Sequence, residues 1–219
     1  MFCQDGLGVL ETAESKFQKK SQRAAEQDRE DVALRRADWF ECQPSVDPEQ
    51  LVFLDETGLK TNFTRLRGWA FGGERLVEPV PAGRWETSTL VHAIALDGTR
   101  AAMVLDGPMD GVCFTGFCET SLAPALNPGD FVVMDNLGSH KSESARLIIE
   151  SVGAQVVLLP PYSPDLNPIE MIFSKLKQLV RSQRPRCLSK IVDATGTALS
   201  FISTEDIHAC FEHCGYLTA

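Results

Sequence analysis

The stretch QVVLLPPYSPDLNPIE at residues 155–170 decides the fold class. Residues 155–159 form a mainly apolar run that is typical of a buried strand. Four prolines follow within the nine residues from Pro160 to Pro168, and because proline fixes φ and lacks an amide hydrogen, this loop is predicted to be stiff and extended. Helical periodicity begins at Ile169. The stretch therefore predicts a strand, a rigid loop and a helix, in that order.

Further elements of both kinds are predicted on either side of this stretch. Three early strands joined by turns predict an antiparallel meander, and later strands separated by helices predict parallel neighbours. Together they predict an α/β fold with a mixed sheet flanked by helices, and C-terminal helices after residue 187. The predicted strands are 51–54, 87–96, 101–105, 131–134 and 155–159, and the predicted helices are 114–126, 142–151 and one from 169 onward.

Composition narrows the class of protein. The chain has 219 residues, of which 43% are hydrophobic and 23% charged, so it can bury a core and is not a disordered or low-complexity protein. Its net charge of -9 argues against electrostatic binding of nucleic acid by the whole surface, although a local basic face remains possible. No apolar run is long enough to span a membrane and no signal peptide is evident. We therefore expect a soluble, cytoplasmic protein.

The seven cysteines do not suggest a disulfide framework, because their number is odd and their spacing scattered. Cys210, His213 and Cys214 lie close enough in sequence to suggest a zinc site, but no second pair completes a tetrahedral ligand set. Buried, reduced thiols are the preferred interpretation.

The chain divides into two parts by composition. Residues 1–46 include a highly charged segment, 15–41, that is typical of a solvated helix or tether. Residues 47–219 carry the predicted strands and the helices that alternate with them. We expect the second part to be the functional domain, with a C-terminal helical extension.

Three carboxylates occupy positions where catalytic residues are often found. Asp55 and Asp135 each follow a short apolar strand, and Glu170 lies in the first turn of the helix after the proline loop. If the loop brings that helix back across the sheet edge, the three can meet in one pocket. Carboxylate oxygens without histidine or cysteine partners suit Mg²⁺ or Mn²⁺.

Each carboxylate also has a purely structural interpretation. Asp55 precedes a turn, Asp135 can cap the segment after it, and Glu170 stands three residues after Asn167 with Pro168 at the first helical position, as in a capped helix. For any one residue alone the structural interpretation is favoured. Their joint placement favours a shared site.

The sequences around these carboxylates resemble a known family. LDETG at 54–58, MDNLGSHK at 134–141 and PPYSPDLNPIE at 160–170 are similar to the catalytic domain of bacterial insertion-sequence transposases in the mariner superfamily, and 34 residues separate Asp135 from Glu170. The resemblance implies a ribonuclease H-like fold and DDE endonuclease chemistry. It also implies that Asp55, Asp135 and Glu170 bind two Mg²⁺ or Mn²⁺ ions, and that the partners are transposon-end and target DNA, with a homodimer as the active form.

Secondary candidates surround the triad. His140 either contacts a phosphate or assists proton transfer, or it orients the loop after Asp135. Asn136 is favoured as a turn residue over a metal ligand. The helix from Ile169 has an apolar stripe and an opposite basic face, which next to such a site favours a DNA track over plain solvated surface. The predicted DNA-contact residues are Lys175, Lys177, Arg181 and Arg184, with Lys60, Arg65, Arg67 and Arg75 from the segment after the first strand.

The resemblance is incomplete at the N-terminus. Members of the family carry a helix-turn-helix region that binds the element's terminal repeats, and residues 1–14 match no such region. Either a separately encoded DNA-binding part or a chain that is a fragment would explain this. Two functions stay open: an active nuclease and strand-transferase domain, or a catalytically silent remnant that binds DNA or forms oligomers.

Overall fold

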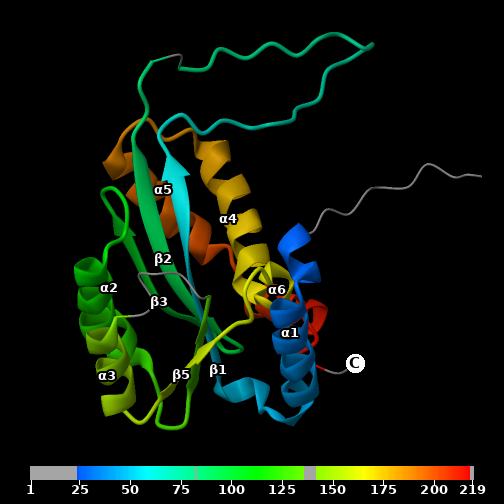
Figure 1. The fold of residues 1–219 in the computed structure, drawn as a ribbon. Coiled ribbons are helices and arrows are strands. Elements are labelled where there is room, and N and C mark those ends of the chain that lie inside the picture. The colour runs from blue at the N-terminus through cyan, green and yellow to red at the C-terminus, as the bar shows by residue number, and fades with distance from the viewer. Residues whose placement is uncertain (1–23, 82, 136–141, 218–219) are drawn as a thin grey trace, which may run out of the picture.

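The computed structural model describes residues 24–81, 83–135 and 142–217, and its centre is a five-stranded sheet (Figure 1). The strand order is β3-β2-β1-β4-β5. β1 pairs antiparallel with β2, and β2 with β3, whereas β4 runs parallel to both β1 and β5. The predicted mixed sheet is confirmed. The strands are β1 (Leu51–Lys60), β2 (Thr87–Ala95), β3 (Gly98–Leu105), β4 (Phe131–Met134) and β5 (Gln155–Leu158).

Helices cover both faces of the sheet (Figure 1). One face is covered by α2 (Gly111–Phe117) and α3 (Glu143–Ser151), and the other mainly by α4 (Pro168–Gln183). The remaining α-helices are α1 (Glu30–Cys42), α5 (Leu188–Ser200) and α6 (Thr204–His213). Short 3-10 helices are formed by Ala25–Asp28, Gln43–Ser45, Pro48–Gln50, Ala123–Ala125 and Pro164–Leu166, and a short π-helix by Cys118–Leu122. No helix of the described ranges has the length and apolar character needed to cross a bilayer.

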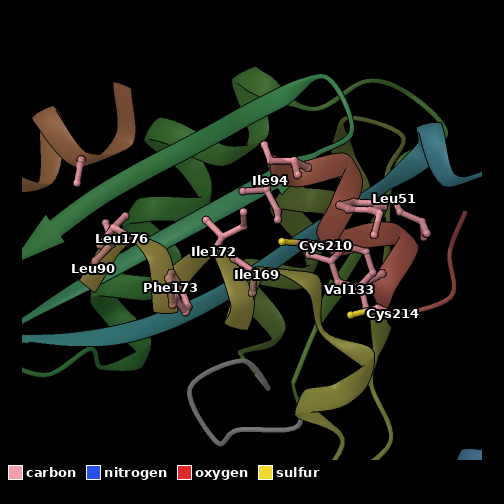
Figure 2. Close-up of a cluster of buried hydrophobic side chains, with 14 of the residues drawn as sticks. Leu51, Leu90, Ile94, Val133, Ile169, Ile172, Phe173, Leu176, Cys210 and Cys214 are labelled. Carbon is pink, nitrogen blue, oxygen red and sulfur yellow. The ribbon is translucent and has the colours of Figure 1, made fainter. Parts of the chain in front are cut away.

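The core between the sheet and α4 fixes where the proline loop ends. Residues 169, 172, 173, 176 and 180 place an apolar stripe on one side of α4, at the three- and four-residue spacing of an amphipathic helix. Figure 2 shows this stripe against β1, β2 and β4, with Cys210 and Cys214 of the C-terminal region in the same cluster. Phe53 of β1 meets Phe211 of α6 edge-on, with ring centroids 5.2 Å apart. The start of α4 is therefore held over the sheet.

Two predicted elements differ from the structure. β1 does not end at Leu54 but continues to Lys60, because β2 pairs with it from Phe53 through Lys60. Asp55 therefore lies inside β1, although the parallel pairing with β4 does end at Leu54. The predicted helix 114–126 begins earlier, at Gly111, where the Asp110 side chain accepts a hydrogen bond from the amide of Cys113.

Candidate active site

Asp55 lies where β1 loses one of its two neighbouring strands, because the pairing with β4 ends at Leu54 and only β2 continues. Its carboxylate is on the α4 face, like Phe53 two residues earlier, since side chains alternate along a strand. Only 5% of the residue is exposed. Oδ1 accepts a hydrogen bond from the Glu56 amide at 2.7 Å, and Oδ2 accepts one from Nδ2 of Asn167 at 2.8 Å. Each oxygen of the Asp55 carboxylate thus accepts a hydrogen bond that helps to fix its orientation.

Asp135 lies beside Asp55 at the end of the adjacent parallel strand. It follows Met134, the last residue of β4, and Met134 is in register with Leu54 of β1. The two aspartates therefore follow paired residues on neighbouring strands. The Met134 carbonyl accepts a hydrogen bond from the Leu159 amide at 2.9 Å, which also brings the start of the proline loop to this edge.

Glu170 reaches the same edge from the first turn of α4. Its amide donates to the Asn167 carbonyl at 3.2 Å, and Pro168 occupies the first turn, where a missing amide hydrogen costs nothing. Desolvation raises the pKa of the Glu170 carboxyl above its usual value; the positive Lys177 opposes that shift and the negative Asp135 adds to it. The ionised Glu170 is therefore short of compensating positive charge.

The three carboxylates line one cleft of about 510 Å³. The rest of its wall is the loop from Leu159 to Asn167. Within the described residues, no three acidic, histidine or cysteine side chains already form a group that could hold a metal ion.

Asn167 is a candidate site residue that the sequence analysis did not identify. It is 3% exposed and sits at the N-cap of α4, yet its side chain makes no capping hydrogen bond. Nδ2 instead donates to Asp55, and Oδ1 is a buried acceptor for which the described residues provide no donor. A buried acceptor without a donor is costly in a finished core and is expected where water or a ligand completes the site. The capping interpretation of this motif therefore does not apply to the Asn167 side chain.

These groups fit a hard divalent cation. The available ligands are carboxylate and amide oxygens, the raised pKa of Glu170 signals a deficit of positive charge, and Oδ1 of Asn167 has no donor among the described residues. By contrast, Cys210 and Cys214 are buried in the apolar core, and burial raises the pKa of both thiols, that of Cys214 to about 12. The expected buried thiols at these two positions are confirmed.

The predicted basic face of α4 divides into two sides. Lys177 faces the carboxylates: burial lowers its pKa, Glu170 opposes that shift, Arg181 adds to it and Asp55 opposes it. Arg181, one turn further on, lies over the Phe63 ring at 4.7 Å. Lys175 points elsewhere and pairs with Asp206 of α6.

The other sequence candidates lie at or beyond the margins of the cleft. Arg184 forms an ion pair with Glu78 at 2.7 Å. Lys60, Arg65, Arg67 and Arg75 are exposed at the end of β1 and in the long excursion between β1 and β2, visible at the top of Figure 1. Asn136 and His140 lie outside the described residues.

Comparison with known proteins shows the family of the chain. The family model of DDE superfamily endonucleases matches residues 50–192, which include all three carboxylates. The chain belongs to this endonuclease family. No curated protein sequence matches the chain.

Solved structures of the Mos1 mariner transposase share the fold. In the paired-end complex with the left transposon end, the Mos1 chain is 18% identical, with a TM-score of 0.75 over 92% of this chain and 64% of that one. A Mos1 paired-end complex with Mn has 18% identity and a TM-score of 0.73, over 91% and 65% of the two chains. The isolated Mos1 catalytic domain is 14% identical, with a TM-score of 0.64 over 90% and 94%. The chain thus spans less than two thirds of the Mos1 chains in those complexes, and it has the fold of their catalytic domain.

Proposed function

We propose that this DDE endonuclease domain cleaves and joins DNA phosphodiesters at transposon ends, with Asp55, Asp135 and Glu170 as the catalytic triad. The observation that carries the proposal is the cleft itself. Two aspartates on neighbouring strands and a glutamate from a separate helix line one cleft, inside the segment that matches the family. The three residues lie far apart in the sequence, so it is the fold that brings them to one cleft.

We further propose that the site takes two Mg²⁺ or Mn²⁺ ions. Such a pair supplies an activated nucleophile and stabilises both the attacking and the leaving oxygen of an in-line displacement. The chain's own carboxylates, Asp55, Asp135 and Glu170, would hold the pair. Asn167 keeps the Asp55 carboxylate in one orientation through its Nδ2 hydrogen bond. Mos1 paired-end complexes with Mn and with Mg support this choice of ion.

Lys177 and Arg181 are the proposed start of the DNA track. They lie on the side of α4 that carries Glu170, seven and eleven residues further along, so one helix face joins the carboxylates to the positive charges. Lys60, Arg65 and Arg67 extend the positive charge along the end of β1 and the segment after it, where the Phe63 ring lies under Arg181. Lys175 and Arg184 are less suited to this role, because each has an acidic partner in the structure.

The whole protein's activity extends beyond this domain. Mos1 is known in a complex with its left transposon end and in a strand-transfer complex, which support transposon-end and target DNA as the partners here. We propose that the active form is a homodimer, that residues 47–219 form the catalytic unit with 1–46 as its tether, and that a DNA-reading part acts with it. When a freed 3′-hydroxyl replaces water as the nucleophile, the same carboxylates serve strand transfer.

Nicking of supercoiled plasmid in Mn²⁺ tests the proposal. Asp135→Asn keeps the shape of the side chain and removes its charge, so we expect it to abolish nicking that the wild type shows. Asp106→Asn, the same change at an exposed position after β3, is the matched control and should nick like the wild type. The assay is repeated with the chain fused to a sequence-specific DNA-binding domain. Equal inactivity of the wild type and Asp135→Asn in both formats, with DNA binding retained, would establish the silent remnant instead.

A further inference from the structure

Helix α1 touches the proline loop although it lies outside the segment that matches the family. Nη1 and Nη2 of Arg36 donate to Oδ1 and Oδ2 of Asp165 at 3.0 and 2.6 Å, and Nη1 also donates to Oγ of Ser163 at 2.6 Å. The Arg36 side chain is only 15% exposed. A guanidinium that grips a carboxylate with two parallel hydrogen bonds fixes direction as well as distance.

A second side chain from the same segment holds a strained part of the loop. Nε2 of Gln27 donates to the carbonyl of Tyr162 at 2.6 Å. Tyr162 has a φ of 57°, in the left-handed region that a bulky residue adopts only when its surroundings hold it there. The segment 25–42 therefore restrains the loop at Tyr162, Ser163 and Asp165.

The far end of the loop is anchored differently. Oη of Tyr216 donates to the Leu166 carbonyl at 2.7 Å, and Asn167 donates to Asp55. These two contacts fix the end of the loop to the core, whereas its middle, at Tyr162, Ser163 and Asp165, is held by the segment 25–42. Glu170 begins α4 directly after this loop, so the position of the loop determines how Glu170 and Asn167 face Asp55.

We infer that Arg36 is a positioning residue for the carboxylate site: by fixing Asp165 and Ser163 it sets the loop that delivers Asn167 and Glu170, so that site geometry depends on helix α1. The inference rests on the proposed function of the cleft. Arg36 lies on α1 and acts through the loop, and its effect reaches the carboxylates through Asn167 and α4. A displacement of α1 would alter the site without touching a catalytic group.

Removing the pair from either side tests the inference. Arg36→Gln and Asp165→Asn each break the pair between Arg36 and Asp165, and each should weaken Mn²⁺ binding, measured by calorimetry, about 3- to 10-fold. The double variant should lose no more than Arg36→Gln, which also breaks the hydrogen bond to Ser163. Amide hydrogen exchange at Tyr162, Ser163 and Asp165 should become faster in both. Plasmid nicking at saturating Mn²⁺ should slow about 10-fold with unchanged affinity for DNA, because small misplacements of reacting groups lower the rate.

Arg100 offers a matched control. It lies on β3 and pairs with Asp97 of the preceding turn at 3.1 Å, and its side chain is 18% exposed, close to the value for Arg36. Arg100→Gln should leave Mn²⁺ binding, amide exchange in the loop and nicking as in the wild type. Asp135→Asn serves as the reference for a site that has lost its ions.

The outcomes separate two kinds of failure. If Arg36→Gln lowers thermal stability but leaves Mn²⁺ affinity and loop exchange unchanged, Arg36 is only a structural residue and the inference is overturned. The same holds if Arg36→Gln weakens Mn²⁺ binding while Asp165→Asn does not, since the effect would not pass through the pair between Arg36 and Asp165. If the wild type and Asp135→Asn bind Mn²⁺ equally, the proposed function itself fails.

Discussion

Replacing Asn167 by aspartate gives the sharpest test of the site geometry, because it changes one atom at a buried contact. The wild-type amide donates from Nδ2 to Oδ2 of Asp55 over 2.8 Å, in a setting where Asn167 is 3% and Asp55 5% exposed. The variant replaces the donor by a second carboxylate oxygen. In metal-free protein the two side chains then either repel or share a proton.

The structure sets the scale of the effect. Two unit charges separated by the length of this hydrogen bond repel by about 6 kcal/mol at an effective dielectric constant of about 20. Taking up one proton at pH 7 costs less, about 4 kcal/mol, because an aspartic acid has an ordinary pKa of about 3.9 and each unit costs about 1.4 kcal/mol. The pair therefore shares a proton at pH 7, and the variant should be about 4 kcal/mol less stable than the wild type.

The pH dependence follows from proton binding. Between about pH 4 and pH 7 the folded variant holds a proton that the unfolded chain has released, so the free energy of unfolding falls as pH rises, by about 1.4 kcal/mol per unit relative to the wild type. Below about pH 4 both states are protonated and the difference disappears. The protonated carboxyl that Asn167→Asp introduces can donate to Asp55 as the amide did, which is why acid restores stability.

Urea unfolding in EDTA at several pH values between about 4.5 and 7.5 measures this slope. Gln155→Glu is the matched control: it makes the same amide-to-acid change at an exposed residue near the start of β5, and its slope should stay near zero. Adding Mg²⁺ at neutral pH should recover part of the loss in Asn167→Asp. A loss of stability that is equal at every pH would refute the contact between Asn167 and Asp55.

Three further predictions concern charge in and near the cleft. Glu170→Gln should stabilise metal-free protein at pH 7, because burial raises the pKa of the Glu170 carboxyl, and the gain should be less than about 1 kcal/mol because the side chain is partly exposed. The gain should vanish below about pH 4.5, where the unfolded chain is also protonated. Urea unfolding in EDTA measures it, and a loss of stability at pH 7 would contradict it. Replacing Lys177 and Arg181 together by alanine should reduce the magnitude of the slope of log affinity for DNA against log salt concentration by about two. Lys175→Ala should change this slope less, because Lys175 already pairs with Asp206. Thermal unfolding with added ions should show stabilisation by Mg²⁺ and Mn²⁺, and stabilisation by Zn²⁺ alone would count against an all-oxygen site.

Local sequence was sufficient to predict the elements whose partners are near in the chain. The apolar run of β4, the glycine-closed helix α3 and the start of α4 at Pro168 all match the structure to within a residue or two. The length of β1 was not predictable in this way. Residues 55–60 mix polar and apolar types, and they form a strand because β2, some thirty residues later, supplies hydrogen-bond partners as far as Lys60.

The same limit applies to the candidate site. The three carboxylates stand out because each lies beside an apolar run, and their placement on one cleft follows from the sheet order. Asn167 did not stand out, because an asparagine before Pro168 is equally typical of a helix cap. Only the position of Asp55, 112 residues earlier, shows that the amide faces the site.

Three residues that line this cleft depart from local preference or carry a shifted pKa, and hydrogen bonds with distant residues hold two of them. Tyr162 has a left-handed φ, and its carbonyl accepts a hydrogen bond from Gln27. The Asn167 side chain does not cap α4 and donates a hydrogen bond to Asp55 instead. Glu170 lies in a setting that raises the pKa of its carboxyl, mainly through desolvation. Because such departures cost stability and persist only where the surrounding structure imposes them, their concentration at one edge of the sheet argues that this edge is shaped for a ligand. A cation bound among the carboxylates would relieve the charge, and the hydrogen bonds from Arg36 and Gln27 would keep the loop in place before it arrives.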